Sequence, residues 1–335
     1  MRNFYKTLYE TWFYMKPFSV VVGGANMDLL GLAQEAVKPH TSNPGKVSSS
    51  PGGVGRNIAE NLARLGQTCM LMAPIGNDTN GAFLKHHCQQ LGIQTQCMVV
   101  LEGESTSTYL SIVSDTGEMQ IAIADMALID QFGSAQLQAF LPQLKGASIV
   151  VLDANLSPDC LAFLVNSLPD QLFFVDTVSV YKATRVVPFL SRIHSIKPNL
   201  LEAQAMAGTD FGPHPSNVQL MQLATWFMEQ GVKHLYLSLG AKGLLFCDVN
   251  QCFIMTPSVS VNTSDIVNSN GAGDAMMAAI VNAWMQGNDS HERARAALAC
   301  AHVAMASEAT INPHLTPQLL LQALKENPCS ITPLI

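Results

Sequence analysis

The sequence has few charged residues and no concentration of positive charge. Only 13% of its 335 residues are Asp, Glu, Lys or Arg, the formal net charge is −7, and no Lys/Arg-rich run occurs. Nucleic acids and anionic membrane surfaces attract proteins through clustered positive charge. Neither is therefore expected as the main partner. No apolar run reaches the roughly 20 residues that a transmembrane helix needs.

The cysteines lack any pattern that would indicate a metal site or a disulfide framework. The sequence contains neither a C-x-x-C pair nor a Cys/His spacing typical of metal ligands. The eight cysteines are scattered over positions 69, 88, 97, 160, 247, 252, 300 and 329. This usage predicts reduced, mostly buried thiols in a cytoplasmic protein.

The first sixteen residues, Met1 to Lys16, lack the apolar region and small-residue cleavage site of a signal peptide. They are aromatic and mildly basic, and Met15-Lys16-Pro17 resembles a natural start just before an apolar strand. We expect residues 1–16 to be a tail and residues 17–335 to form the functional domain. An added helix that packs on the body or on a partner is the alternative.

What the sequence does have is an apolar content of 48% and a repeated strand–helix order. This order predicts an α/β fold with a mainly parallel central sheet and helices on both faces. Strands are expected at 18–22, 68–75, 147–152, 172–175, 193–196 and 233–239, and a strand-like segment ends near Val267. Helices are expected at 58–65, 81–91, 137–144, 159–166, 217–230, 291–307 and 316–326.

Three consecutive strands interrupt this alternation, at about 94–100, 105–113 and 119–124. An irregular stretch from about 29 to 50, with proline and a serine run, also lacks a helical period. We expect these segments, 29–50 and 94–125, to form a small sheet that stands off the body. Such a sheet is suited to act as a lid over a ligand.

The most informative stretch is Asn268-Ser269-Asn270-Gly271-Ala272-Gly273-Asp274, which leads into an apolar helix. Its glycines allow a tight turn, and the first turn of a helix offers unpaired N–H groups to an anion. Asp274 in that turn has two interpretations. It is a helix cap, or it is a proton acceptor beside an anion hole, as phosphoryl transfer to an alcohol requires.

A second glycine-rich stretch, Pro51-Gly52-Gly53-Val54-Gly55-Arg56-Asn57, opens the helix expected at 58–65. Gly53 permits close approach of a polar ligand, and the amide of Asn57 suits a pair of sugar hydroxyls. Asn26 and Asp28 follow the first strand, where open α/β sheets place ligands. An ordinary turn explains these two residues equally well.

Two later motifs also have local and functional interpretations. Asn199-x-x-Glu202 is a capping-box pattern, but it would also place an Asn and a Glu where they organise water around Mg²⁺. Ser238, Gly240 and Gly243 follow a strand; they form either a hairpin or a close passage for nucleotide phosphates.

Taken in their order along the chain, from Asn26 to Asp274, the five motifs resemble the ribokinase-like (PfkB) family of sugar and nucleoside kinases. The resemblance runs from Phe18 to the C-terminal helices, and the paired Gly-Gly-x-Gly-x-Asn and Gly-Ala-Gly-Asp signatures carry it. Within the family the chain is most similar to members that phosphorylate pseudouridine. The stretches Ser42–Lys46, Pro51–Ala59 and Ser107–Ser111 with Thr116–Met119 carry this, together with Gly271–Ala278. Ribokinases usually have lysine where this chain has Val54.

The resemblance implies transfer of a phosphoryl group from ATP to the 5′-hydroxyl of pseudouridine. It makes Asp274 the base and Gly271, Ala272 and Gly273 the anion hole. The nucleoside would be held by Asn26, Asp28, Gly53, Asn57, Asn155 and Thr108, with Ser107 and Tyr109 as further lid contacts. Asn199 and Glu202 would hold Mg²⁺ through water, and Ser238, Gly240 and Gly243 would lie along ATP. Asp176 and Lys182 either approach the phosphates or are a turn residue and a surface lysine.

One departure from the family pattern is clear. Many relatives have Asp-Thr-Thr before the anion hole and bind a monovalent cation there, whereas this chain has Asn268-Ser269-Asn270. Activation by potassium is therefore doubtful. As in relatives, a lid with exposed strand edges predicts a homodimer.

Two other functions remain open and a third is disfavoured. The first is a ribokinase or another sugar or nucleoside kinase of the same family, and the second is a non-catalytic nucleotide-binding regulator. A Rossmann oxidoreductase is disfavoured because no G-x-G-x-x-G follows the first strand with an acidic residue about 20 positions later.

Overall fold

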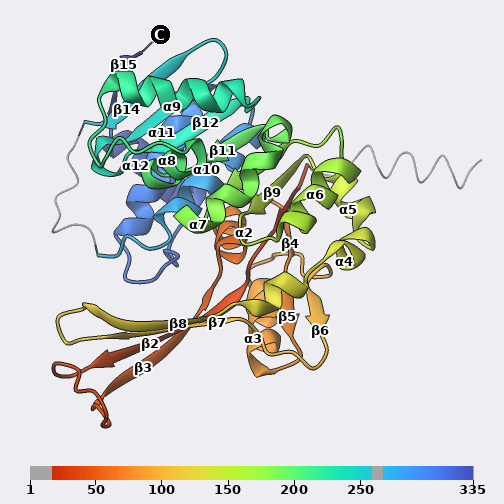
Figure 1. The fold of residues 1–335 in the computed structure, drawn as a ribbon, viewed down its shortest axis with the longest axis vertical. Helices are drawn as coiled ribbons and strands as arrows, with labels where there is room; N and C mark the ends of the chain where they lie inside the picture. The colour runs from red at the N-terminus through yellow and green to blue at the C-terminus, as the bar shows by residue number, and fades with distance from the viewer. Residues whose placement is uncertain (1–16, 259–266, 335) are drawn as a thin grey trace, which may run out of the picture.

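The computed structural model describes residues 17–258 and 267–334. Its central sheet contains β1 (Ser19–Val22), β4 (Cys69–Met72), β9 (Ile149–Asp153), β10 (Phe173–Asp176), β11 (Ser195–Lys197), β12 (His234–Ser238), β13 (Leu244–Cys247), β14 (Cys252–Pro257) and β15 (Cys329–Pro333). The nine strands lie in the order β15-β14-β13-β12-β11-β10-β9-β1-β4 (Figure 1). Neighbours from β4 to β12 are parallel, and those from β12 to β15 are antiparallel.

Helices cover both faces of this sheet because successive side chains of a strand point to opposite faces. Val20 and Val22 of β1 pack in one apolar core with α6 (Pro158–Ser167), α8 (Leu200–Ala207) and α9 (Asn217–Glu229). Val21 packs in a second core with α2 (Val54–Arg64), α10 (Ala272–Met285) and α11 (Ser290–Met305). The expected sheet, mainly parallel and covered on both faces, is confirmed.

The remaining helices are shorter or lie at the periphery. They are α3 (Thr79–Gln90), α4 (Ser134–Gln138), α5 (Leu141–Gly146), α7 (Val180–Ala183), α12 (Pro317–Glu326) and the 3₁₀ helices η1 (Ala127–Gln131), η2 (Thr184–Arg192) and η3 (Gly240–Lys242). In the described part of the chain, no helix has both the length and the apolarity needed to cross a membrane. All eight cysteines are free thiols, and seven of them are buried.

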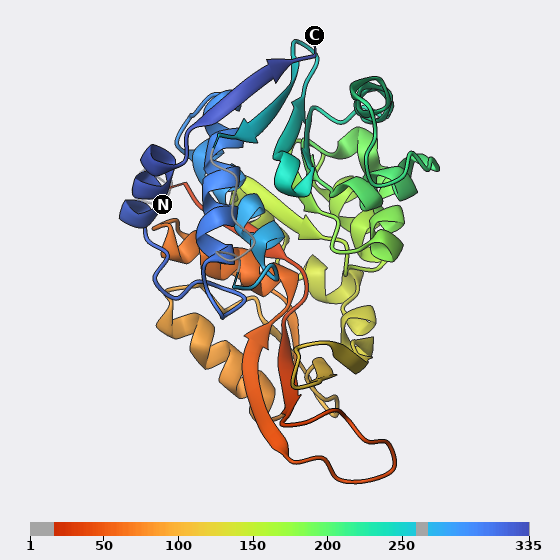
Figure 2. The ribbon, with the colours of Figure 1, turned by 90° about the vertical axis from the view of Figure 1, so that its left-hand side faces the viewer.

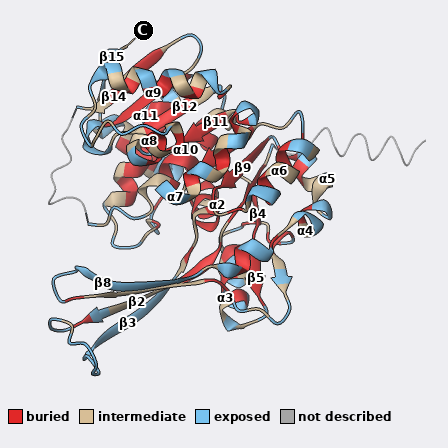
Figure 3. Ribbon diagram, in the orientation of Figure 1, coloured by how far each residue is buried: buried red, intermediate tan, exposed pale blue. Residues whose placement is uncertain are grey.

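A separate four-stranded sheet stands away from the body (Figures 1 and 2). It contains β2 (Asn26–Ala33), β3 (Gly45–Gly52), β7 (Thr108–Val113) and β8 (Met119–Asp125) in the order β3-β2-β7-β8. Most of its residues are exposed or only partly buried (Figure 3). We refer to these four strands as the lid. Only residues 23–25 separate β1 of the body from β2, so the lid begins next to the carboxyl end of the central sheet.

Two expectations about the lid are wrong in detail. The strand expected at 94–100 forms β6 (Val99–Leu101), which pairs with β5 (Pro74–Gly76) in a separate two-stranded sheet. Asn26 and Asp28 are not in a turn, because they are already part of β2. Cross-strand pairing of Asn26 with Gly52 and of Asp28 with Ser50 extends the strand back to the edge of the body.

Other predictions differ from the structure or fall outside it. The helix expected at 137–144 is two short helices, and Pro142 lies in the first turn of the second. Strands β14 and β15 were not expected. The tail 1–16 lies outside the described residues, as does most of the strand expected before Asn268; Val267 itself lies in a bend.

Candidate active site

Helix α10 begins with a backbone shape that only glycine adopts readily. Gly271, the residue before the helix, has φ 79°, and a Cβ there would lie 2.0 Å from the carbonyl oxygen of Thr310. The first intrahelical bond runs from the Ala275 amide to Gly271 O at 2.9 Å. Among the described residues, no acceptor forms a hydrogen bond with the backbone N–H groups of Gly273 and Asp274. These two donors remain available for an anion at the positive end of the helix dipole.

Asp274 does not cap its helix with a side-chain hydrogen bond. Its carboxylate is buried and accepts a hydrogen bond from Asn57 Nδ2 at 2.7 Å. Burial, reinforced by the negative charge of Asp176, raises the pKa of Asp274 to about 8. Asn57 and Lys197 act in the opposite direction but do not cancel the rise. A carboxylate with a pKa close to the pH of the medium is suited to accept a proton from an alcohol.

The bond between Asn57 and Asp274 brings the two glycine-rich turns together. In the first turn, Gly53 precedes α2 with φ 94°, and a Cβ on it would lie 2.5 Å from Gly24 O. Asp153 fixes this approach, because its Oδ2 accepts from the amides of Gly24 and Gly55, each at 2.8 Å. Asp153, at the carboxyl end of β9, thereby holds the carboxyl end of β1 and the N-terminus of α2 against each other.

A cavity of about 750 Å³ opens between the lid and this first turn. Asn26 Nδ2 donates to Asp28 Oδ1 at 2.6 Å, so Asn26 orients the carboxylate. Burial raises the pKa of Asp28. Across the cavity, Lys182 Nζ donates to Asn155 Oδ1 at 2.5 Å. Of the sugar-contact candidates, Asn26, Asp28, Gly53, Asn57 and Asn155 line the cavity.

The lid contributes hydroxyl groups to this cavity, but not from every residue that the sequence suggested. Ser107 and Tyr109 line it, and Ser48, Ser50 and Ser111 do so as well. Thr108 does not; its hydroxyl donates to Thr106 O at 3.1 Å. Strand alternation explains the difference, because Thr108 lies between two residues that face the cavity.

A second cavity, of about 570 Å³, lies on the other side of the α10 N-terminus. It is lined by Ala272, Gly273 and Asp274 together with Asn199, Glu202, Ser238, Gly240 and Gly243. Helix α11 contributes the apolar residues Leu298, Ala301 and Met305 to its lining. The two cavities meet where α10 begins, since Asn270 and Gly271 line the first and the next three residues line the second.

The local interpretations of the two later motifs are also confirmed. Asn199 and Glu202 form a reciprocal capping box at the start of α8, and Glu202 also accepts from Thr177 Oγ1 at 2.6 Å. Strands β12 and β13 form an antiparallel hairpin, which η3 connects. Both motifs nevertheless face the second cavity. A structural and a functional role are therefore compatible at these positions.

Lys197 is a site residue that sequence reasoning missed. It is the last residue of β11, it is buried, and its Nζ lies 3.1 Å from Asp176 Oδ2. A Cβ on Gly273 would lie 3.2 Å from the same Nζ, so the ammonium group lies beside the anion hole. Burial alone would lower the pKa of Lys197, but the carboxylates of Asp176 and Glu202 raise it. A charged residue at the end of an apolar strand was the available signal.

Asp176 and Lys182, for which the sequence left open a place near the phosphates or a role as turn residue and surface lysine, are separated by the structure. Asp176 lines the second cavity with Lys197. Lys182 lines the first cavity, where it contacts Asn155 rather than the anion hole.

Comparison with known proteins identifies the family of the chain. Residues 16–317 match the model of the pfkB family carbohydrate kinases. The chain is 34% identical over 314 residues to the pseudouridine kinase of Escherichia coli (strain K12). The aligned region covers 94% of this chain and 98% of the relative. It is 33% identical over 321 residues to the uncharacterized sugar kinase YeiI of the same organism, covering 95% and 84%.

Among solved structures, the Arabidopsis thaliana ribokinase complexed with ribose and ATP superposes with a TM-score of 0.81 at 20% identity, covering 93% of this chain and 99% of the ribokinase. The fold is therefore ribokinase-like, with a mainly parallel central sheet and a small separate sheet. The chain belongs to the pfkB family of carbohydrate kinases and is a phosphotransferase that acts on an alcohol group.

Proposed function

We propose that this protein is an ATP-dependent kinase that phosphorylates the 5′-hydroxyl of pseudouridine, with Asp274 as the base. One observation carries the proposal. The two cavities meet at the N-terminus of α10, where Asp274 is hydrogen-bonded to Asn57 of the first glycine-rich turn. An acceptor alcohol in the first cavity and a phosphate donor in the second would come together beside a buried carboxylate and the backbone amides of Gly273 and Asp274.

The first cavity would hold the ribosyl group through its polar lining. Asp28, oriented by Asn26, and the amides of Asn57 and Asn155 supply acceptors and donors for ribose hydroxyls. Gly53 allows the sugar to approach the backbone, because no side chain occupies that position. The free end of the ribosyl group, the 5′-hydroxyl, would then point towards Asp274.

The transfer itself requires few protein groups. The 5′-oxygen attacks the γ-phosphorus of ATP, the bond from that phosphorus to the β–γ bridging oxygen breaks, and ADP leaves. Asp274 accepts the proton of the hydroxyl. The amides of Gly273 and Asp274 would hold the equatorial phosphoryl oxygens, and Lys197 would lie close enough to offset their charge. The products are pseudouridine 5′-phosphate and ADP.

The second cavity fits ATP with Mg²⁺. The apolar residues that α11 contributes to it suit a nucleobase, and Ser238, Gly240 and Gly243 line it together with the first turn of α10. The Glu202 oxygens already accept from Thr177 Oγ1, Asn199 N and Asn199 Nδ2. Contact with Mg²⁺ through water therefore suits Glu202 and Asn199 better than direct ligation. The metal would neutralise phosphate charge. The Asn268-Ser269-Asn270 stretch offers no carboxylate for a monovalent cation, which keeps potassium activation doubtful.

The choice of pseudouridine over free ribose is supported by the lid and by the relative of known substrate. Ser48, Ser50, Tyr109 and Ser111 would stand over a base attached to the sugar, and their hydroxyls can pair with its polar edges. The pseudouridine kinase of E. coli covers nearly the whole chain. A ribokinase or a kinase for another nucleoside is the second candidate, favoured by the similarity to YeiI. The buried Asp274 carboxylate, with its raised pKa, favours an enzyme over a non-catalytic regulator.

A substrate panel tests this choice. ADP release should be fastest with pseudouridine and slower with uridine, ribose and fructose. The variant Ser50→Ala, combined with Ser111→Ala, should raise the KM for pseudouridine by about 10-fold or more, since each lost hydrogen bond is worth about 0.5–1.5 kcal/mol. The KM for ribose, which lacks a base, should hardly change. Fastest turnover of free ribose or fructose would refute the pseudouridine assignment.

We also propose that the protein forms a homodimer through the lid. Ile121 and Ile123 of β8 are 55% and 57% exposed, and their neighbour Ala122 pairs with the cavity-facing Ser111. The two isoleucines therefore lie on the outer face of the lid, where a second copy would bury them. Sedimentation should give twice the chain mass of 36.1 kDa. Ile121→Lys with Ile123→Lys should give the single mass, whereas Ala122→Lys on the opposite face should not. A monomeric wild-type protein would contradict the proposal.

A further inference from the structure

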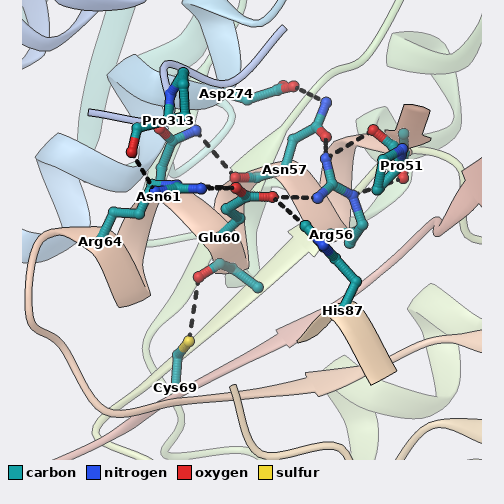
Figure 4. Close-up of polar contacts among 12 residues, drawn as sticks. Pro51, Arg56, Asn57, Glu60, Asn61, Arg64, Cys69, His87, Asp274 and Pro313 are labelled. Carbon is teal, nitrogen blue, oxygen red and sulfur yellow. Dashed lines mark hydrogen bonds and ion pairs between the residues drawn. The ribbon is translucent and has the colours of Figure 1, made fainter. Parts of the chain in front are cut away.

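Arg56 is among the largest of the fully buried side chains. It lies in the first turn of α2. It is only 1% exposed, and one helical turn separates it from its ion-pair partner Glu60. Its Nε donates to Gly52 O at 3.0 Å and its Nη2 to Pro51 O at 3.1 Å. The same Nη2 contacts Asn57 Oδ1, and Nη1 contacts Glu60 Oε2 (Figure 4). The guanidinium group thus joins the first glycine-rich turn to Asn57.

The amide of Asn57 has two ends, and each has a different partner. Its Oδ1 accepts from Arg56, and its Nδ2 donates to Asp274 Oδ2 at 2.7 Å. A flipped amide would place Nδ2 against the guanidinium and Oδ1 against the carboxylate. Both contacts would then be repulsive, because a guanidinium has no acceptor and a carboxylate has no donor. Figure 4 shows Asn57 between Arg56 and Asp274.

We propose that Arg56 is a positioning residue for phosphoryl transfer, which fixes the Asn57 amide so that its Nδ2 points at Asp274. This inference rests on the proposed role of Asp274 as the base. Arg56 itself touches neither reacting atom. It acts through Asn57, which holds the carboxylate in one orientation and favours its ionised form. Asn57 is further held by α2, since its carbonyl accepts from Asn61 Nδ2 at 3.0 Å.

Glu60 completes the arrangement by holding Arg56. It also accepts from Arg64 Nε at 2.8 Å, and His87 Nε2 lies 3.4 Å from its Oε2. Burial disfavours the charged form of Glu60, but the two arginines hold its pKa below the ordinary value. The buried ion pair therefore stays charged, and Arg56 keeps its place.

The charged groups near Asp274 and near Arg56 determine how the reaction rate depends on pH. Asp274 is influenced by Asp153 from β9, Asp176 from β10 and Lys197 from β11, besides Asn57. Arg56 is close enough to influence Asp28 on β2 and Cys88 on α3, besides Glu60. Loss of the Asn57 hydrogen bond removes an interaction that lowers the pKa of Asp274. The acid limb of the rate profile should then move to higher pH.

Arg56→Lys tests the proposal, with Arg64→Lys as the matched control. Lysine keeps the positive charge beside Glu60 but cannot reach Glu60, Asn57 and two carbonyls together. We expect Arg56→Lys to lower kcat for pseudouridine about 10–100-fold, the value of a hydrogen bond to a charged group, with a smaller change in KM. Its acid limb should lie at higher pH. Arg64 contacts the same Glu60 but not Asn57, so Arg64→Lys should leave kcat and the acid limb at the wild-type values.

A double-mutant cycle separates positioning from a general effect on structure. In an Asn57→Ala background, Arg56→Lys should cause no further loss of kcat, because the residue through which it acts is gone. An equal loss in both backgrounds would overturn the proposal, as would an Arg56→Lys variant that behaves like Arg64→Lys. If Arg56→Lys does not fold, the double variant Arg56→Met with Glu60→Gln removes the donor and leaves no unpaired charge at either position; it should show the same loss.

The outcome can be told apart from failure of the proposed function. If Asp274→Asn abolishes turnover while Arg56→Lys matches its control, only the positioning role of Arg56 is wrong. If Asp274→Asn retains full turnover with pseudouridine, the role of Asp274 as the base is wrong. If the wild-type protein does not phosphorylate pseudouridine, the proposed function itself is wrong.

Discussion

Asp274→Asn is expected to lower kcat for pseudouridine by about 10²–10⁴-fold, the usual contribution of a general base. Asparagine keeps the shape of the side chain but cannot accept the proton of the 5′-hydroxyl. The apolar cores do not involve its carboxylate, and the fold should persist. Initial rates of ADP release at saturating substrates measure the loss, and calorimetric titration should show that ATP still binds. Turnover within a few-fold of the wild type would exclude Asp274 as the base.

The same variant should be more stable than the wild type in alkaline solution. Burial raises the pKa of Asp274 in the folded protein to about 8, above the ordinary value of 3.8 for an aspartate side chain. The folded state therefore binds more protons than the unfolded state between these values, and the contribution of Asp274 to stability falls as pH rises through that window. Above about pH 8 the carboxylate is ionised in the folded state as well, and the full cost of burying its charge reduces the free energy of unfolding. Asparagine carries no charge to bury, and Tm should rise by about 1–2 °C per kcal/mol relieved. An unchanged or lower Tm in alkaline solution would contradict the raised pKa.

Lys197→Met is expected to have the second-largest effect, on stability and on turnover together. The ammonium group lies 3.1 Å from Asp176 Oδ2 and also stabilises Glu202 and Asp274. Removing one partner of a buried ion pair leaves an uncompensated charge, at a cost of about 3–5 kcal/mol. Turnover should fall as well, because the anion hole loses its neighbouring positive charge. Thermal unfolding and ADP release measure the two effects.

A second substitution separates the two consequences of losing Lys197. Asp176→Asn in the Lys197→Met background removes the unpaired carboxylate, and most of the lost stability should return. Turnover should not return, since the cation beside Gly273 is still missing. Full recovery of kcat in the double variant would show that Lys197 acts only through stability.

The sequence predicts the body of the fold well because its signals are local. Apolar strands such as 18–22 alternate with helices, and a strand with both faces buried needs helices on each side. The order of the glycine-rich motifs indicates one cleft, and the bond between Asn57 and Asp274 brings two of them together. Glycine at 53 and 271 is explained by positive φ angles that other residues adopt only under strain.

Features that depend on pairing between distant residues are not predictable in this way. Val99–Leu101 has the same apolar composition whether it joins the lid or pairs with Pro74–Gly76. Strand alternation decides that Tyr109 faces the cavity and Thr108 does not, and a one-residue shift in register would reverse them. The roles of Lys197 and Arg56 depend on partners, Asp176 and Asn57, whose placement only the folded structure gives.

The pH dependence of kcat/KM for pseudouridine, at saturating MgATP, tests the central role of Asp274 most directly. The account predicts a rise of about tenfold per pH unit that levels off near pH 8 or above, since bound phosphates add negative charge. Asp274→Asn should show residual activity without this limb. A wild-type profile that is flat from about pH 6 to about pH 9 would contradict the assignment of a buried carboxylate as the base.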